Sequence, residues 1–307
     1  MARSARRPGS TDSVPPAPPT RRWRSYAGWR EIQDYILATT ERHGVRPYIR
    51  FGSTVCSAHF DTASATWAIG LADGSTVTAR HFVMATGPLH VPQVPKLPGL
   101  EGFQGKVFHS ARWDHDYDLA GKRVASIGTG GSAIQYCPEI APKVAQLHVF
   151  QRTPAWVIPR DTRRYSAGAK RRFARFPWWR RLHRARLYWT NESRVWPIFH
   201  AWIARSVQPL AKWFIRRSVG DPALAAKLTP DYTIGCKRVI VSSTLYPALC
   251  RPNVTLHDSS DGIDEIVPAG IITTGGDKVE LDAIVYATGY DATDGATTFT
   301  VTGHDST

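Results

Sequence analysis

The sequence predicts an α/β protein built around a parallel sheet at residues 121–151, and three observations point to this fold. A strand, a glycine-rich turn, a helix and a second strand follow one another within that stretch. A hairpin that leads into an apolar strand and an Ala-Thr-Gly turn occurs twice, at residues 74–87 and 276–289. From residue 160 the chain becomes basic and rich in tryptophan, which indicates a helical insert. Together these patterns predict dinucleotide-binding α/β architecture with a helical insert.

The chain begins with a basic arm. Residues 1–22 carry five Arg, five Pro and one Asp without apolar periodicity, so we expect this arm to be disordered. The apolar side chains of residues 29–36 then fall on one helical face. This spacing predicts a helix that ends near His43 and Gly44.

Short strands are predicted after this helix. Apolar and polar residues alternate at 48–51, 55–60 and 66–71, and Ala-Asp-Gly at 72–74 is typical of a hairpin turn. The apolar run at residues 81–84 predicts a further strand, which we expect to be buried.

This last strand leads into the first of two Ala-Thr-Gly turns. Residues 74–87 read Gly-x-x-Val…Phe-Val-Met-Ala-Thr-Gly and residues 276–289 read Gly-x-x-Val…Ile-Val-Tyr-Ala-Thr-Gly; in each the last glycine lies 13 positions after the first. At a turn of small residues the backbone can lie against a cofactor or cross between domains. The turn residues are Ala85, Thr86, Gly87, Ala287, Thr288 and Gly289.

A further motif precedes the central sheet. Residues 103–114 match Phe-x-Gly-x-x-x-His-x-x-x-Trp-Asp at every fixed position, namely Phe103, Gly105, His109, Trp113 and Asp114. A histidine beside aromatic residues is by itself more often packed or solvated than catalytic. The segment, however, resembles the fingerprint of the Baeyer–Villiger monooxygenases, within the flavin-containing monooxygenase superfamily. This resemblance implies a functional role for His109 that couples domains more than it transfers protons.

The glycine-rich turn lies between a predicted strand at residues 122–127 and a predicted helix at 133–144. Its residues are Gly128, Thr129, Gly130, Gly131, Ser132 and Ala133. The first glycine permits the turn, Gly130 lets backbone N–H groups approach a pyrophosphate, and Ala133 lets helix and strand pack closely. Since a helix N-terminus favours negative charge, this pattern predicts a dinucleotide site and outweighs the alternative of a purely structural turn.

The second strand of this unit, predicted at residues 146–151, ends in Arg152 and Thr153. An acidic residue at this place would bind the ribose hydroxyls of NAD, whereas a guanidinium suits a 2′-phosphate. We therefore expect NADPH to be preferred over NADH. The alternative is an arginine that is merely solvated at a strand end.

Residues 160–219 hold 16 Lys or Arg, two acids and six of the 11 tryptophans. Their charge surplus of +14 equals the net charge of the whole chain. The spacing of Trp178, Leu182, Ala185 and Trp189 predicts an amphipathic helix, and similar spacing recurs later in the segment. Such helices can lie on anionic membranes or nucleic acid. We favour a helical insert at 160–229 with its apolar face on the core, leave peripheral membrane contact open, and expect no nucleic acid partner.

Residues 232–239 resemble the Gly-x-Lys-Arg segment of the same family, which meets the nicotinamide cofactor. The resemblance implies that Lys237 joins Arg152 and Thr153 around the 2′-phosphate. It also implies a catalytic position for Arg238, beside the flavin and the nicotinamide.

The resemblance covers residues 23 to about 300 and implies a flavoprotein with two dinucleotide-binding domains. We expect residues 23–118 to be a partial FAD-binding domain, 119–290 a complete Rossmann-like NADPH domain, and 291–307 the start of a truncated C-terminal FAD segment. No Gly-x-Gly-x-x-Gly turn precedes residue 128, so we expect an incomplete FAD site and little activity of this chain alone.

The family's reaction would use NADPH, FAD and O2 to insert one oxygen atom into a small carbonyl substrate, giving an ester or lactone through a C4a-peroxyflavin. N- or S-oxygenation, a non-catalytic remnant that binds NADPH, and a basic surface-binding protein remain as alternatives.

The composition narrows the class of protein further. No apolar run approaches the ~20 residues that a membrane span requires, so the sequence does not predict an integral membrane protein. The four cysteines, Cys56, Cys137, Cys236 and Cys250, form no Cys-x-x-Cys pair. We therefore expect no metal site, no disulfide framework and a cytoplasmic location.

Overall fold

The computed structural model describes residues 27–160, 165–291 and 299–303. The chain divides into two compact units, Met1–Ser53 with Asp161–Leu182 and Thr54–Arg160 with His183–Thr307. The predicted basic arm at residues 1–22 lies outside the described residues, as does most of 291–307.

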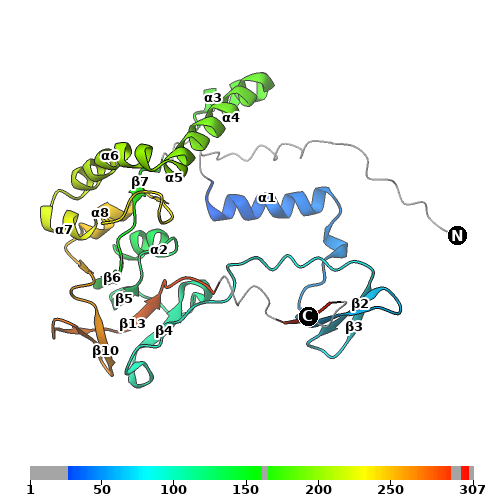
Figure 1. Cartoon of the computed structure of the whole chain (residues 1–307), viewed down its shortest axis with the longest axis horizontal. Helices are drawn as coiled ribbons and strands as arrows, with labels where there is room; N and C mark the ends of the chain where they lie inside the picture. The colour runs from blue at the N-terminus through cyan, green and yellow to red at the C-terminus, as the bar shows by residue number, and fades with distance from the viewer. Residues whose placement is uncertain (1–26, 161–164, 292–298, 304–307) are drawn as a thin grey trace. The chain divides into compact units, whose positions relative to one another are not determined.

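The second unit is organised around a five-stranded parallel sheet (Figure 1). The strand order is β4-β13-β5-β6-β9. In that order the strands are Lys106–His109, Ala283–Tyr286, Arg123–Ile127, Gln146–Phe150 and Val254–His257. The predicted strands at 122–127 and 146–151 are therefore confirmed as β5 and β6. Strand β13 enters between β4 and β5 although it lies about 160 residues further along the chain.

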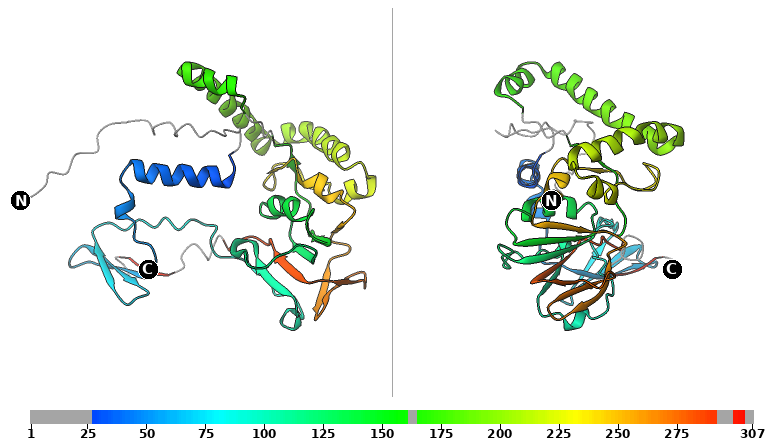
Figure 2. Two further views of the ribbon diagram at one scale, coloured as in Figure 1. Left: turned by 180° about the vertical axis from the view of Figure 1, so that it is seen from behind. Right: turned by 90° about the vertical axis from the view of Figure 1, so that its left-hand side faces the viewer.

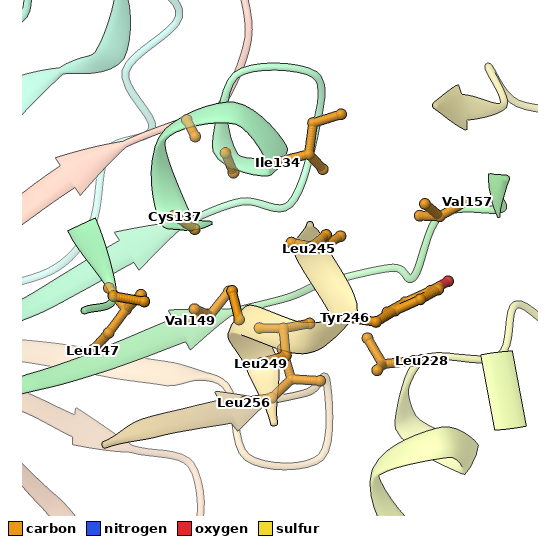
Figure 3. Packing of buried hydrophobic residues seen from close by; sticks show 14 of the residues in the cluster. Ile134, Cys137, Leu147, Val149, Val157, Leu228, Leu245, Tyr246, Leu249 and Leu256 are labelled. Carbon is orange, nitrogen blue, oxygen red and sulfur yellow. The ribbon is translucent and has the colours of Figure 1, made fainter. Parts of the chain in front are cut away.

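Alternate residues of these strands face two separate cores. Val124, Leu147 and Val285 belong to one core, together with helices α2 (Ala133–Ile140) and α8 (Leu245–Leu249). Figure 3 shows Leu147 and Val149 of this core with side chains from both helices. Ala125 and Ile284 point to the other face. An antiparallel sheet covers that second face; its strands are β10 (Ile263–Val267), β11 (Gly270–Thr273) and β12 (Lys278–Glu280). Helix α2 and β10 accordingly lie on opposite sides of the central sheet (Figures 1 and 2).

The predicted helical insert is present. It contains α3 (Ala167–Arg175), α4 (Pro177–Glu192), α5 (Trp196–Phe199), α6 (Ala201–Val219) and α7 (Pro222–Lys227). Strands β7 (Val157–Ile158) and β8 (Ile240–Val241) pair in parallel on either side of the insert in sequence. The expectation that its apolar faces cover the core holds for α6, which buries Ala204, Ala211 and Ile215. It is wrong for α3 and α4, neither of which buries any residue.

A four-stranded sheet contains the strands predicted at 55–60 and 66–71. They form β1 (Val55–Asp61) and β2 (Thr66–Leu71), with β3 (Thr76–Ala79) after the predicted hairpin turn and β14 (Thr300–Thr302) parallel to β1. The strand predicted at 48–51 is wrong, because Arg46–Tyr48 is a 3-10 helix instead. Pro47 favours that outcome, since its ring fixes φ in the helical range and removes a ladder donor.

The buried strand predicted at residues 81–84 is also wrong. These residues form no strand, and Val83 is 83% exposed. A strand of this kind is held by hydrogen bonds to neighbours, and no described strand pairs with it. Phe82 packs instead on Trp67 and Phe299, with ring centroids 5.4 and 6.2 Å apart.

Helix α1 (Trp29–Arg42) belongs to the first unit and confirms the helix predicted to end near His43. It buries no residue, although its apolar side chains share one face as predicted. The helix is therefore amphipathic, and its apolar face is not buried in the described structure.

Candidate functional site

The glycine-rich turn begins where three strand ends meet. Gly128 follows β5 with φ +100°, and its N–H donates to the carbonyl of Phe150 at the end of β6 (2.9 Å). A Cβ at this position would lie 2.6 Å from the carbonyl oxygen of Ala287, which follows β13. Only glycine fits here, because both the backbone conformation and the contact exclude a side chain. The turn is thereby fixed to the second Ala-Thr-Gly segment.

The middle of the turn is open. A Cβ at Gly130 or Gly131 would meet no heavy atom within 4 Å outside the local chain, and both glycines are exposed. Ser132 precedes α2 without using its side chain as a cap. Ala133 is fully buried against the sheet, as the sequence predicted. Residues 128–133 therefore leave room beside the N-terminus of α2 for a diphosphate such as that of NADPH. We call these residues the glycine-rich cradle.

Arg152 and Thr153 line a pocket of about 300 Å³ together with Lys227, Asp258 and Ser260. The side-chain amide of Gln151 donates to the carbonyl of Lys227 (2.9 Å), which holds the end of α7 beside the end of β6. Two cationic side chains thus face one pocket, and a phosphate monoester is the kind of group that such a pair binds.

The same pocket contains acidic groups. The ammonium of Lys227 lies 3.7 Å from a carboxylate oxygen of Asp258. A hydrogen bond from the Ser260 hydroxyl and the nearby Lys227 lower the pKa of Asp258, so this carboxylate is ionised at neutral pH. Asp258 positions Lys227 and competes with a phosphate for its charge, which leaves Arg152 as the main phosphate-binding candidate.

Sequence reasoning missed Lys227. The Asp221-Pro222 pair is a recognisable helix start, since the Asp221 carboxylate accepts the N–H of Ala223 (2.9 Å) and proline occupies the first turn. That signal places Lys227 near a helix end. It does not predict that this helix end shares a pocket with Arg152, because the two residues are about 75 positions apart in the chain.

The second Ala-Thr-Gly segment is tied to a chain segment that follows the first one. The Thr288 hydroxyl donates to the carbonyl of Gln93, and the Gln93 N–H donates to the carbonyl of Gly289 (3.0 Å). Pro92 and Tyr290 form an antiparallel bridge. The second Ala-Thr-Gly segment therefore runs alongside residues 92–93.

The first Ala-Thr-Gly turn has a different environment. Ala85, Thr86 and Gly87 are exposed, and Gly87 has φ +73° with open space around a would-be Cβ. The carbonyl of Gly87 lies 2.7 Å from the Nδ1 atom of His90. The structure does not bring this turn to the glycine-rich cradle.

His109 joins the fingerprint to the second Ala-Thr-Gly segment. It ends β4 opposite Tyr286 of β13, and its Nδ1 accepts the N–H of Ala111 (3.1 Å). Its buried ring meets the Tyr290 ring edge to face, with centroids 5.9 Å apart. Burial lowers the pKa of His109, and the Gly289 carbonyl opposes part of that shift. A buried neutral imidazole at this place favours positioning over proton transfer.

The other fingerprint residues hold β4 and its following turn. Trp113 packs on Phe108 (5.1 Å between centroids) and on Tyr136 of α2 (5.2 Å). Asp114 pairs with Lys106 (2.6 Å). A Cβ at Gly105 would lie within 2.6 Å of the Phe103 ring and of a backbone carbonyl. The fingerprint therefore connects β4 to the helix that follows the glycine-rich turn.

Lys237 and Arg238 lie outside the pocket around Arg152. The ammonium of Lys237 lies over the Tyr232 ring (4.8 Å to the centroid), and the Tyr232 hydroxyl donates to the carbonyl of Pro154 (3.0 Å). Lys237 is thus connected to the pocket wall without lining it. Arg238 is exposed. Their family roles remain predictions.

The described residues supply one strand-to-helix phosphate turn, at residues 128–133. FAD carries a diphosphate of its own and would need a second turn of this kind. These residues therefore offer places for the diphosphate and the 2′-phosphate of NADPH, and they fit FAD only in part. Among the described part of the chain, no group of three or more His, Cys, Asp or Glu side chains could hold a metal ion.

Comparison with known proteins gives a consistent result. Residues 16–294 match the family described as Flavin-binding monooxygenase-like. A Baeyer-Villiger monooxygenase of Streptomyces coelicolor is 46% identical over 278 residues, which are 90% of this chain and 53% of that protein. A Baeyer-Villiger monooxygenase of Pseudomonas aeruginosa is 42% identical, over 92% of this chain and 53% of that protein. The chain spans about half the length of the curated relatives it matches.

Solved structures are similar as well. An oxidized steroid monooxygenase bound to NADP superposes with a TM-score of 0.82 at 33% identity, over 92% of this chain and 61% of the other. A cyclohexanone monooxygenase bound to epsilon-caprolactone gives a TM-score of 0.82 at 27% identity, over 94% and 63%. Both the α/β fold and the flavin monooxygenase resemblance predicted from the sequence are thereby confirmed.

Proposed function

Because this chain belongs to the flavin-binding monooxygenase-like family, we propose that it acts as an NADPH- and FAD-dependent Baeyer–Villiger monooxygenase. In that reaction NADPH provides two electrons, one atom of O2 enters a ketone to give an ester or lactone, and the other atom leaves as water. The observation that carries this proposal is the open turn at Gly130 and Gly131 followed by a cationic pocket at Arg152.

The residues of the chain bind and orient the nicotinamide cofactor. The N-terminus of α2 and the backbone of the turn would hold its diphosphate. Arg152, with Thr153 and Lys227, would hold the 2′-phosphate and so select NADPH over NADH. Lys237 would add charge at the same wall, through its contact with Tyr232.

Flavin, when bound, supplies the oxygen chemistry that no amino acid side chain provides. The contribution of Arg238 would be a guanidinium that stays protonated at any working pH and stabilises negative charge that develops on oxygen. His109 would keep the Gly289–Tyr290 backbone in position through its ring contact and burial. No proton transfer is assigned to it.

The ketone substrate class is part of the proposal. Similar proteins carry the names steroid monooxygenase and cyclohexanone monooxygenase, so cyclic ketones are the first substrates to test. N- or S-oxygenation is the alternative outcome of the same experiment. A cytoplasmic location, where NADPH is abundant, would suit this function.

The test is to supply the purified chain with FAD, NADPH, isotopically labelled O2 and a cyclic ketone. Because the described residues supply one phosphate turn, we expect little ester from this chain alone; each ester molecule that does form should carry one labelled oxygen atom, coupled to NADPH oxidation. Arg238→Ala should suppress ester formation while NADPH still binds. A sulfoxide or N-oxide from matched substrates without any ester would contradict the Baeyer–Villiger assignment. NADPH binding without product in any of these assays would leave nucleotide binding alone as the function.

A further inference from the structure

Helix α4 exposes an apolar stripe along its whole length. Trp178, Leu182, Ala185 and Trp189 follow one another at spacings of four, three and four residues, so they share one helical face. Trp178, Leu182 and Trp189 are 60%, 56% and 67% exposed, and α4 buries no residue. We call these four residues the α4 stripe. Soluble surfaces rarely expose tryptophans in such a row, and apolar rows of this kind mark interaction sites.

Positive charge surrounds the α4 stripe. Arg181 and Arg186 lie on either side of it on the helix, by their spacing from Leu182 and Ala185. The described residues of α3 and α4 carry eight cationic side chains and one acid, Glu192. The eight are Lys170, Arg171, Arg172, Arg175, Arg180, Arg181, Arg184 and Arg186. A partner for this helix must therefore be strongly anionic.

Aromatic residues cluster at both ends of the helix. Trp178 meets Trp179 edge to face with centroids 5.4 Å apart, and Tyr188 meets Trp189 in the same way at 5.4 Å. Tryptophan and tyrosine prefer the headgroup level of a bilayer, where one part of the ring is apolar and the other is wet. Arginine can bury its aliphatic stem and keep its guanidinium at the phosphates.

We propose that α4 is a peripheral membrane-binding helix that lies flat on an anionic lipid surface. The α4 stripe would enter the headgroup–acyl boundary, and Arg181 and Arg186 would contact lipid phosphates. Its 16 residues are about 24 Å long, which suits lying in the interface plane. No helix among the described residues is long and apolar enough to cross a membrane.

Helix α1 provides an internal control for this inference. It also exposes apolar residues, including Trp29 at 68% and Ile36 at 55%. Its charges differ, since it carries Glu31, Asp34 and Glu41 against Arg30 and Arg42. An exposed tryptophan on a weakly acidic helix should not bind anionic lipid. The positive charge around the α4 stripe, in addition to the exposure of its side chains, distinguishes α4 from α1.

The experiment is flotation of the full chain with vesicles of phosphatidylcholine and phosphatidylglycerol, or of phosphatidylcholine alone. We expect binding to the anionic vesicles at low salt that weakens as salt rises. Trp178→Ala with Trp189→Ala should reduce binding at least ~10-fold through lost apolar burial. Arg181→Gln with Arg186→Gln should reduce it about 5-fold per arginine.

Trp29→Ala is the matched control and should leave vesicle binding unchanged. Because α4 buries no residue, the α4 variants should keep the circular dichroism spectrum and NADPH affinity of the parent chain. Equal binding to both kinds of vesicle, no binding at low salt, or binding that survives loss of both tryptophans would overturn the proposal. So would binding to duplex DNA that depends on the arginines but not on the tryptophans, if anionic vesicles are not bound.

Discussion

The two Ala-Thr-Gly segments have nearly the same sequence pattern and different structures. Each follows a hairpin, and in each the turn's glycine lies 13 positions after the glycine of the hairpin. The strand before the second one, β13, lies between β4 and β5, and Val285 is fully buried there. The residues before the first one form no strand, and Val83 is 83% exposed. The apolar pattern is therefore sufficient for a buried strand only where neighbouring strands satisfy both of its edges.

The two Ala-Thr-Gly segments also differ in their contacts with the glycine-rich turn and the fingerprint. The second segment is in contact with the glycine-rich turn through Ala287 and with the fingerprint through the rings of Tyr290 and His109. In the first segment a Cβ at Gly87 would meet no heavy atom within 4 Å, and all three turn residues are exposed. The nucleotide site thus depends on the second segment, and the following predictions test that asymmetry.

The largest contrast is expected between the glycines at Gly128 and Gly87. Gly128→Ala would place a Cβ 2.6 Å from the Ala287 oxygen in a left-handed backbone, which should lower the free energy of unfolding by about 2–6 kcal/mol. Gly87→Ala meets open space and should cost at most ~1–2 kcal/mol from its backbone conformation. Urea denaturation of both variants measures the difference. Similar costs at both positions would show that the Gly128–Ala287 contact is not important for stability.

A smaller contrast is expected between Val285 of β13 and Val83, which lies in no strand. Val285→Ala removes a fully buried side chain from the sheet and should lower the free energy of unfolding by about 1.5–3 kcal/mol. Val83→Ala acts on an exposed side chain and should remain within ~0.5 kcal/mol of the parent. The same denaturation measurement applies. A loss at Val83 as large as that at Val285 would mean that residues 81–84 are buried in solution.

The smallest expected effect concerns the loss of stability at acidic pH. The Nδ1 atom of His148 on β6 lies 3.1 Å from the Nε2 atom of His257 on β9. Burial is the larger cause and the neighbouring His257 the smaller one, and together they lower the pKa of His148 to about 4. The unfolded chain binds this proton with an ordinary pKa near 6.5, so stability is complete above that pH and is lost as pH falls from 6.5 toward 4. One group can contribute a slope of about 1.4 kcal/mol per pH unit at most.

Urea denaturation at several pH values measures this slope. His148→Gln should flatten it between pH 6.5 and 4. An unchanged slope in the His148 variant would show that this histidine is protonated equally in the folded and unfolded chain.

Local patterns in the sequence predicted local structure well. The strand, turn, helix and strand at 122–151 were readable because alternating apolar residues, glycines and helical spacing act over a few residues. The same holds for the hairpin at 72–74 and for α1. Residues 48–51 and 81–84 have strand-like patterns, but the first is preceded by Pro47 and the second has no pairing partner among the described strands.

Features that depend on distant segments could not be predicted. The position of β13 between β4 and β5, and the contact of Gly128 with Ala287, join residues far apart in the chain. Lys227 lines the Arg152 pocket at the end of α7, where the Gln151 side chain donates to its carbonyl from 76 positions earlier in the chain. The exposure of α4 is a further example, since amphipathic spacing does not state whether a face is covered.

We propose that Arg152, at the end of β6, binds the 2′-phosphate of NADPH. The direct measurement is calorimetric binding of NADPH and NADH to the parent chain, to Arg152→Ala, and to Lys143→Ala as an exposed cationic control. Losing one charge-assisted phosphate contact costs about 1.5–3 kcal/mol, so Arg152→Ala should bind NADPH ~10- to 150-fold more weakly and bind NADH almost unchanged. The control should bind both cofactors as the parent does. Equal losses for both cofactors in Arg152→Ala, or equal parent affinities for NADPH and NADH, would contradict the account.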